Sequence, residues 1–288
     1  MQQNLDTELL RTLVAIADTG GFASAARSVH RTQSAVSMQM KRLEAVVGQE
    51  LFEKRGRRTL PNARGRDLLL HARQILRLQD EALAAFRAPG IHGEVALGAC
   101  DDYVLSFVPP ILARYARLHP NVHVRLDARD STKLIRATVE GELDIALVNI
   151  VDDEIRHEKL TSEPLVWVGS ASYATHEKDP LPLAVESDCV WGRWARDTLD
   201  RAGRRYRNAY STFNIGGLIA LVGAGLAVSV MSRSSVPASL RVLGETEGFP
   251  PLPSTSMGLV LGGAPPSPAA AAMVGLLREE LGRGAIAA

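Results

Sequence analysis

The chain has 288 residues, of which 46% are apolar and 23% are charged. A chain of this length is longer than one hydrophobic core usually serves, so it suits two or three compact units. The composition excludes a disordered protein. Two cysteines, Cys100 and Cys189, are too few for a disulfide framework or the usual zinc site, and no secretion signal is visible. The longest uncharged apolar stretch, residues 215–231, is interrupted by glycines. We therefore expect a cytoplasmic protein with no membrane segment, no metal and no cofactor.

The net charge of +1 hides an uneven distribution along the chain. Residues 1–87 hold 14 Lys/Arg against 9 Asp/Glu, a balance of +5. Residues 88–288 hold 19 against 23, a balance of −4. A basic front and a mildly acidic remainder indicate that only the N-terminal part meets a polyanion.

Apolar spacings of three and four predict three helices in the first fifty residues. The first covers about residues 6–18, the second lies around Ala25 and Ala26, and the third lies around Met40 and ends at Gly48. The small residues of the second helix would let a neighbouring helix cross it closely. A helix-turn-helix needs that crossing so that its second helix can enter the major groove of DNA.

The segment LFEKRGRRTLPN then predicts a β-hairpin with its tip at residues 55–57, followed by a helix with Asn62 as its N-cap. Residues 54–66 contain six basic side chains and no acidic one. Basic residues beside a reading helix suit contacts with phosphates, which supply most of the affinity for DNA. The alternative is an ordinary solvated charged surface.

On the third helix, hydrogen-bonding side chains lie opposite the apolar ones. Gln33 at its N-terminus can pair with adenine, serines can bond to a base or a phosphate, and Met38 can contact a thymine methyl group. The predicted DNA-binding residues are Ser24, Thr32, Gln33, Ser34, Ser37, Met38, Lys41, Arg42, Arg55, Arg57 and Arg58.

A long helix is predicted over about residues 63–86, with a heptad-like seam of Leu69, Ala72, Leu76, Gln79, Leu83 and Phe86. Such a narrow seam favours pairing with a second copy of the chain, so we predict a homodimer. The alternative is packing against its own domain.

The remaining chain alternates strands and helices after a break at APGIHG. A βαβαβ order over about residues 94–150 predicts an α/β fold with a parallel sheet. Within it, residues 104–118 are expected to form one helix. Further strands are expected near residues 165–170, 189–192 and 207–212, with a helix near residues 195–202 and a last helix over about residues 268–281.

The N-terminal sequence resembles that of LysR-type transcriptional regulators. The resemblance is clearest over residues 10–58. It rests on Phe22, Ala25, Ala26, Gln33, Ser34, Ala35, Val36, Ser37, Leu43, Glu44, Gly48, Leu51, Phe52 and Arg55, and on Gly65 just beyond that stretch. Within the family the chain is most similar to the LrhA/HexA/PecT-like branch. The resemblance implies a winged helix-turn-helix over residues 1–61, a dimerising linker helix over 62–87 and a hinge over 88–91. It also implies a two-lobed α/β effector domain like type 2 periplasmic binding proteins, with one lobe over 92–162 plus 266–288 and the other over 163–265.

The same resemblance implies double-stranded DNA as the partner, a dimer or tetramer, and a small-molecule effector in a cleft between the lobes. The residues expected at that cleft are Cys100, Asp101, Asp102, Tyr103, Ser131, Thr132, Asn149, Ser211, Thr212 and Phe213. Most of them lie where a strand leads into a helix, the place where open α/β sheets bind ligands. If Asp101 and Asp102 line the cleft, they favour a neutral or amine-bearing effector; the alternative is that they only cap a helix.

Three other functions are alternatives to a ligand-tuned regulator. An enzyme is disfavoured because the sequence shows no phosphate loop, metal-ligand cluster or nucleophile elbow. A nucleoid-type protein that binds DNA without sequence preference is the second alternative, and a regulator with a vestigial cleft is the third. Redox sensing by the two cysteines is less favoured than a role as small buried side chains.

Overall fold

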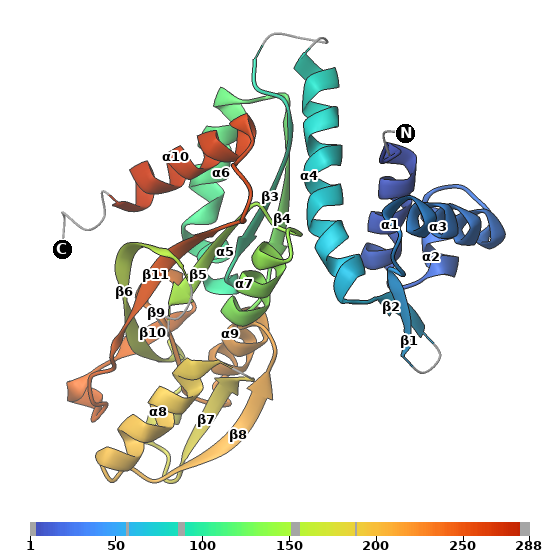
Figure 1. The fold of residues 1–288 in the computed structure, drawn as a ribbon. Coiled ribbons are helices and arrows are strands. Elements are labelled where there is room, and N and C mark those ends of the chain that lie inside the picture. Colours follow the sequence, from blue (N-terminus) through green and yellow to red (C-terminus); the bar gives the residue numbers. More distant parts are fainter. Residues whose placement is uncertain (1–3, 56–57, 86–89, 151–155, 188, 283–288) are drawn as a thin grey trace.

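The computed structural model describes residues 4–55, 58–85, 90–150, 156–187 and 189–282. In Figure 1 the long helix α4 stands between a small N-terminal helical domain and a two-lobed α/β region. None of the described helices has both the length and the apolar character needed to cross a bilayer.

The three predicted N-terminal helices are present. They are α1 (Thr7–Thr19), α2 (Phe22–Ser28) and α3 (Gln33–Val47). The Asp6 side chain accepts a hydrogen bond from the Glu8 N–H, and Thr32 Oγ1 accepts one from the Ala35 N–H, so each side chain caps the helix that follows. Helices α1 and α3 end at Gly20 and Gly48, which adopt the left-handed conformation that glycine tolerates.

The predicted hairpin follows as strands β1 (Phe52–Arg55) and β2 (Arg58–Pro61), which pair antiparallel. The N–H of Gly65 donates to Oδ1 of Asn62 at 2.9 Å, as expected for an N-cap. Gly65 has no room for a side chain, because a Cβ there would lie 2.2 Å from the backbone oxygen of Leu51. This glycine therefore lets the first turn of α4 lie against the residue that precedes the hairpin.

Helix α4 (Ala63–Ala85) does not use its seam as predicted. Leu69, Ala72 and Leu76 are buried in the core of the N-terminal domain with residues of α1, so this half of the seam packs against its own chain. The reason is that α1 already offers an apolar face to that side of α4. Leu83 is 52% exposed, and Phe86 lies outside the described residues.

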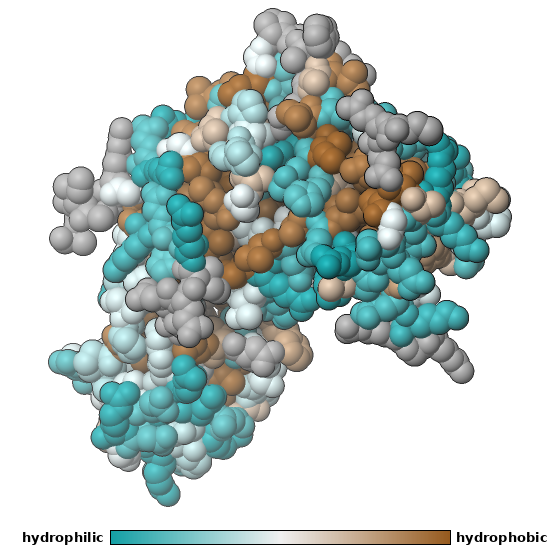
Figure 2. Space-filling view, in the orientation of Figure 1, coloured by the Kyte–Doolittle hydropathy of each residue, from teal (hydrophilic) through white to brown (hydrophobic). Residues whose placement is uncertain are grey.

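A different face of α4 carries apolar side chains that the described chain leaves partly or largely exposed. Ile75 is 36% exposed and Leu78 is 67% exposed. Figure 2 shows hydrophobic residues at the surface over the middle of this helix, whereas the surface of the second lobe is largely hydrophilic.

The first lobe has the predicted parallel order, with β3 between β5 and β4. Its elements are β3 (Gly93–Ala99), α5 (Asp101–Ser106), α6 (Val108–Leu118), β4 (Val122–Ala128), α7 (Ser131–Val139), β5 (Ile145–Ile150) and, from the end of the chain, α10 (Pro268–Gly282). The single helix predicted over residues 104–118 is wrong. The chain starts a new helix after Phe107, because the prolines that follow lack the N–H that a continuous helix requires but fit a first turn.

The second lobe contains the remaining strands and helices. They are β6 (Glu158–Ser170), β7 (Leu181–Glu186), α8 (Val190–Arg201), β8 (Tyr206–Thr212), α9 (Ile215–Gly223), β9 (Ser229–Ser232), β10 (Leu240–Leu243) and β11 (Ser254–Leu261), with 3-10 turns at Thr175–Glu177, Arg233–Ser235 and Glu245–Glu247. The strand predicted over residues 189–192 is wrong. That segment opens α8, whose Trp191, Ala195 and Leu199 recur at helical spacing and are buried.

Two strands connect the lobes into one sheet of the order β10-β6-β11-β5-β3-β4, with β9 also beside β6. The first half of β6 pairs with β11 and its second half pairs with β9 and β10. Strand β11 pairs on its other side with β5 of the first lobe. The lobe boundaries at residues 162/163 and 265/266 stay predictions; the first falls within β6, and the second lies beyond the end of β11 at Leu261.

Ion pairs attach α4 to the domains on both of its sides. Arg77 donates to Asp144 of the first lobe at 2.6 Å. Arg73 donates to Asp18 of α1 at 2.6 Å and lies 4.0 Å from Glu142 of the first lobe. The N-terminal domain is therefore held against the first lobe through side chains of α4.

Candidate functional site

Helix α3 presents a polar face away from its core. Val36, Met40 and Leu43 are buried in the N-terminal domain. The exposed residues of the predicted set on this helix are Gln33, Ser34, Met38, Lys41 and Arg42, and Met38 is 72% exposed. The sequence therefore predicted correctly which face of the helix is free to meet a partner.

An open groove lies between α2, α3 and the hairpin. It is lined by Ser24, Gln33, Ser37, Lys41 and Lys54, with Phe22, Met40 and Phe52 among its apolar residues. The Phe22 and Phe52 rings meet edge to face with centroids 5.0 Å apart, which fixes the hairpin against the start of α2. The structure thus brings hydroxyl, amide and ammonium groups to one concave surface.

The other predicted DNA-binding residues lie at the N-cap of α3 and at the hairpin. Thr32 is exposed and serves as the N-cap of α3. Arg55 and Arg58 face each other in register at the end of the hairpin, and only their backbone is described. Arg57 lies outside the described residues.

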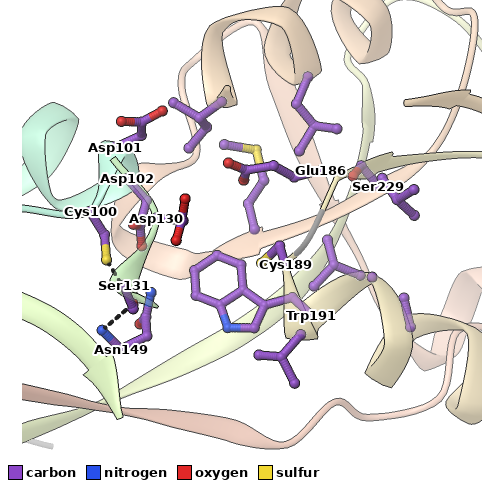
Figure 3. Close-up of a pocket in the computed structure, with 18 of the residues that line it drawn as sticks. Cys100, Asp101, Asp102, Asp130, Ser131, Asn149, Glu186, Cys189, Trp191 and Ser229 are labelled. Carbon is purple, nitrogen blue, oxygen red and sulfur yellow. Dashed lines mark hydrogen bonds between the residues drawn. The ribbon is translucent and has the colours of Figure 1, made fainter. Parts of the chain in front are cut away.

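A cavity of about 230 Å³ lies between the two lobes (Figure 3). From the first lobe it is lined by six of the predicted residues: Cys100, Asp101, Asp102, Ser131, Thr132 and Asn149. The Ser131 hydroxyl accepts a hydrogen bond from the Asn149 N–H at 3.0 Å and lies 3.1 Å from the Cys100 sulfur. These contacts hold the strand-to-helix turns of the first lobe together at the cavity wall.

Tyr103 supports this wall from behind. Its side chain is completely buried, and its hydroxyl donates a hydrogen bond to Oδ1 of Asn149. Burial raises the pKa of the Tyr103 phenol, so it remains a donor at neutral pH. Its place is beneath the cavity and not on its surface.

The second lobe contributes different residues from those predicted. Ser211, Thr212 and Phe213 are not among the cavity-lining residues, and Phe213 is 80% exposed. The lining comes instead from the end of β7 and the start of α8, with Glu186, Cys189, Trp191 and Arg193 as its chemically distinctive members. Glu186 pairs in register with Thr212, so the predicted residues Ser211 and Thr212 lie on β8, the strand beside β7, and not at the cavity.

Four carboxyl groups gather at this cavity: Asp101, Asp102, Asp130 and Glu186 (Figure 3). Burial raises the pKa of Asp102 to about 7, and the charge of Glu163 acts in the same direction. Burial and the charges of the three aspartates raise the pKa of Glu186 to about 7. Burial and Asp130 also raise the pKa of Asp101. At neutral pH the cavity is therefore acidic, and part of its carboxyl groups hold their protons.

Asp130 differs from the other three acids because it has a basic partner. Burial opposes its ionisation, but its bonds to Lys133 outweigh that cost and lower its pKa. The ammonium of Lys133 lies 2.7 Å from Asp130 Oδ2. Of the two arginines on the lining, Arg129 is paired with Asp127, and Arg193 has an exposed side chain.

Both cysteines line the same cavity, one from each lobe. Burial raises the pKa of Cys100, and it raises the pKa of Cys189 to about 12. The thiolate is the reactive form, so both thiols are held in their unreactive form at neutral pH. This supports the reading of both as small, partly apolar lining residues.

Two family models match this chain. A model described as bacterial regulatory helix-turn-helix protein, lysR family, matches residues 7–66, and one described as LysR substrate binding domain matches residues 88–282. The chain is a member of the LysR family of transcriptional regulators. It is thus a DNA-binding regulator with an effector-binding domain and not an enzyme.

Relatives of known name span nearly the whole chain. The transcriptional regulator DgdR of Burkholderia cepacia is 38% identical over 97% of this chain and 95% of its own length. The transcriptional regulator PecT of Dickeya dadantii (strain 3937) is 37% identical over 88% of this chain and 80% of its own length. The PecT match agrees with the branch resemblance seen in the sequence, and DgdR is about equally similar.

Solved structures of the family share the fold. Full-length CbnR in complex with its target DNA superimposes with a TM-score of 0.60, at 19% identity, over 96% of this chain and all of that one. The predicted two-lobed α/β architecture behind a helix-turn-helix and a linker helix is therefore confirmed.

Proposed function

We propose that this LysR-family regulator binds promoter DNA as a homodimer, with α3 in the major groove and the hairpin against the phosphate backbone. A small molecule in the interlobe cavity would tune that binding. The observation that carries the proposal is the exposed polar face of α3 beside a groove that also contains Lys54 of the hairpin.

The side chains of α3 suit different parts of a duplex. Gln33 and Ser34, exposed at the helix N-terminus, reach base edges, and Met38 offers an apolar contact to a thymine methyl group. Lys41 and Arg42 suit phosphates, as do the hydroxyls of Ser24, Thr32 and Ser37. The arginines at the hairpin tip, Arg55, Arg57 and Arg58, extend the same phosphate contacts.

The homodimer is proposed through α4. Half of its heptad seam packs on α1, so the pairing surface is the other apolar face, with Ile75 and Leu78, together with the exposed seam residue Leu83. When a second copy of the chain covers exposed apolar side chains of a helix, the free energy of the assembly falls. Two such dimers would form the tetramer expected from the sequence. A regulator whose partner is promoter DNA is expected in the cytoplasm.

The test is binding to the promoter region upstream of the protein's own gene and to random DNA of the same length, over a range of salt concentrations. We expect a preference of about 10³ or more for the operator. Lys41→Ala should weaken binding to both DNAs and reduce the salt dependence, whereas Gln33→Ala should mainly reduce the preference. Lys159→Ala, the same substitution at an exposed site of β6, is the matched control and should bind like the wild type.

Two results would contradict this function. Equal affinity for both DNAs at every salt concentration would favour the nucleoid-type alternative. Unchanged binding by both α3 variants would show that another surface meets the DNA.

A further inference from the structure

Two buried polar atoms in the interlobe cavity have no hydrogen-bond partner among the described residues. They are the carboxyl oxygen Oδ2 of Asp102 and the indole Nε1 of Trp191. Asp102 is 5% exposed and Trp191 is 6% exposed, and both line the cavity. Buried polar atoms without partners cost free energy, so such atoms in a native protein require an explanation. Here one is an acceptor and the other a donor, and both belong to the wall of one cavity.

The charge of the cavity is the second observation. No Lys or Arg of the described chain forms an ion pair with Asp101, Asp102 or Glu186, whereas Asp130 is paired with Lys133. Figure 3 shows Asp130 and Glu186 nearer to the Trp191 ring than Asp101. The charged and titratable groups on the lining are Asp101, Asp102, Asp130, Glu186, Arg129, Arg193, Cys100 and Cys189. Because Arg129 is neutralised by Asp127, negative charge dominates.

The third observation is the apolar part of the wall, formed by Val185, Val190, Ile215, Leu218 and Met231 around the Trp191 ring. A bare metal ion would gain nothing from this surface. The described residues also contain no group of three His, Cys, Asp or Glu that could hold a metal ion. A volume of about 230 Å³ suits a molecule smaller than a nucleotide or a peptide.

We propose that the effector is a small organic cation: an amine with an apolar skeleton and one hydrogen-bond acceptor. Its ammonium group pairs with Asp102 and Glu186, its acceptor receives the Trp191 N–H, and its carbon skeleton lies on the apolar wall. This inference rests on the proposed role of the cavity as the effector site. It specifies the chemical class that the site takes.

The chemistry of each contact supports this class. An ammonium has three donors and no acceptor, so it complements adjacent carboxylates, and the face of an indole attracts a cation. A plain carboxylate would meet like charge, and it would force the acidic side chains to hold their protons. Binding of a cation favours the ionised form of Asp102 and Glu186, whose pKa values of about 7 lie close to neutral, and therefore releases protons near neutral pH.

The test uses full-length protein and four probes of similar shape: leucinol, leucine, 4-methylpentanoate and 4-methylpentan-1-ol. Valinol and phenylalaninol extend the range of size. Isothermal titration and thermal unfolding are measured at about pH 7 and probe concentrations up to about 10 mM. We expect at least one amino alcohol to bind and to release protons, seen as a binding enthalpy that depends on the ionisation enthalpy of the buffer. The carboxylate should not bind.

Two variants and one control locate the site. Glu186→Gln and Asp102→Asn should each weaken binding of the amino alcohol roughly ten- to a hundredfold. Glu245→Gln removes an exposed carboxylate of the same lobe and should leave binding unchanged. If Asp102→Asn fails to fold, Glu186→Gln decides the matter, because it removes charge from a wall position without changing shape.

Binding of 4-methylpentanoate as tight as that of leucinol would overturn the inference, and so would the absence of binding by every amino alcohol. Unaffected binding in Glu186→Gln would do the same. None of these results touches DNA recognition. A failure of the proposed function would appear separately, as loss of operator preference in the DNA assay.

Discussion

Replacing Glu186 by glutamine should stabilise the ligand-free protein above neutral pH. In the folded protein the pKa of Glu186 is about 7, against an ordinary value of 4.5, because the side chain is buried beside other acids. Between these two values the folded state binds more protons than the unfolded state, so stability falls as pH rises through this range. Above about pH 7 stability falls no further on account of this group, because Glu186 is then ionised in both states. The two pKa values differ by about 2.5 units, so at ~1.4 kcal/mol for each unit the ionised side chain costs about 3.5 kcal/mol at most.

Glutamine keeps the shape of the side chain and removes this cost. For a domain of this size the gain corresponds to a rise of up to about 10 °C in the melting temperature at pH 8. At about pH 3.5, a full unit below the ordinary pKa of 4.5, Glu186 is protonated in both states, so the variant and the wild type should differ little.

Circular dichroism of thermal unfolding at the two pH values, with equal ionic strength, measures both differences. Glu245→Gln, an exposed substitution of the same type, should shift the melting temperature little at either pH. Lower stability of Glu186→Gln at pH 8, or an equal gain at both pH values, would refute the reasoning from the acidic cavity.

Three further predictions follow from features outside this carboxylate. Gly65→Ala should lower the free energy of unfolding by about 1–3 kcal/mol, because the new Cβ would collide with the backbone of Leu51. Gly275→Ala, at an exposed site of α10 with nothing within 4 Å, should leave it unchanged or raise it by up to ~1 kcal/mol. Urea unfolding measures both changes, and a Gly65→Ala protein as stable as the wild type would contradict the close approach. Leu78→Asp should convert the dimer into a monomer, as measured by light scattering. Leu118→Asp, at a site of similar exposure on α6, should leave the dimer intact. A dimer that persists in Leu78→Asp would place the interface elsewhere. Both thiols should react slowly with Ellman's reagent at about pH 8 and fully in denaturant, and fast labelling of the native protein would contradict their buried state.

The N-terminal domain was predictable because its signals are local. Apolar spacings, the cap Asn62 and the terminal glycines each act within a few residues, and the structure confirms all of them. The cap Thr32 was a local signal of the same kind that the prediction did not use. The partner of the α4 seam was not predictable in this way. The spacing of Leu69, Ala72 and Leu76 predicts one apolar face, but it carries no information about which surface covers that face.

The cavity shows the same limit. The rule that ligands bind where strands lead into helices placed the first wall correctly, because β3 and its helix were recognised. The second wall was missed because residues 189–192 were assigned to a strand, which hid the turn between β7 and α8. The helix itself was predicted near residues 195–202, and the spacing of four between Trp191, Ala195 and Leu199 was the available signal that it starts earlier. That Asp102 Oδ2 and Trp191 Nε1 lack hydrogen-bond partners among the described residues depends on contacts between distant segments and has no sequence signal.

The passage of β6 and β11 through both lobes makes each lobe dependent on the other for its main-chain pairing. A change in the angle between the lobes has to be absorbed as twist and bend within these two ribbons. Cutting the chain between the lobes would leave open sheet edges on both halves, which favour aggregation. The effector region therefore behaves as one cooperative unit, and fragments meant to isolate the ligand site should retain residues 90–282 together.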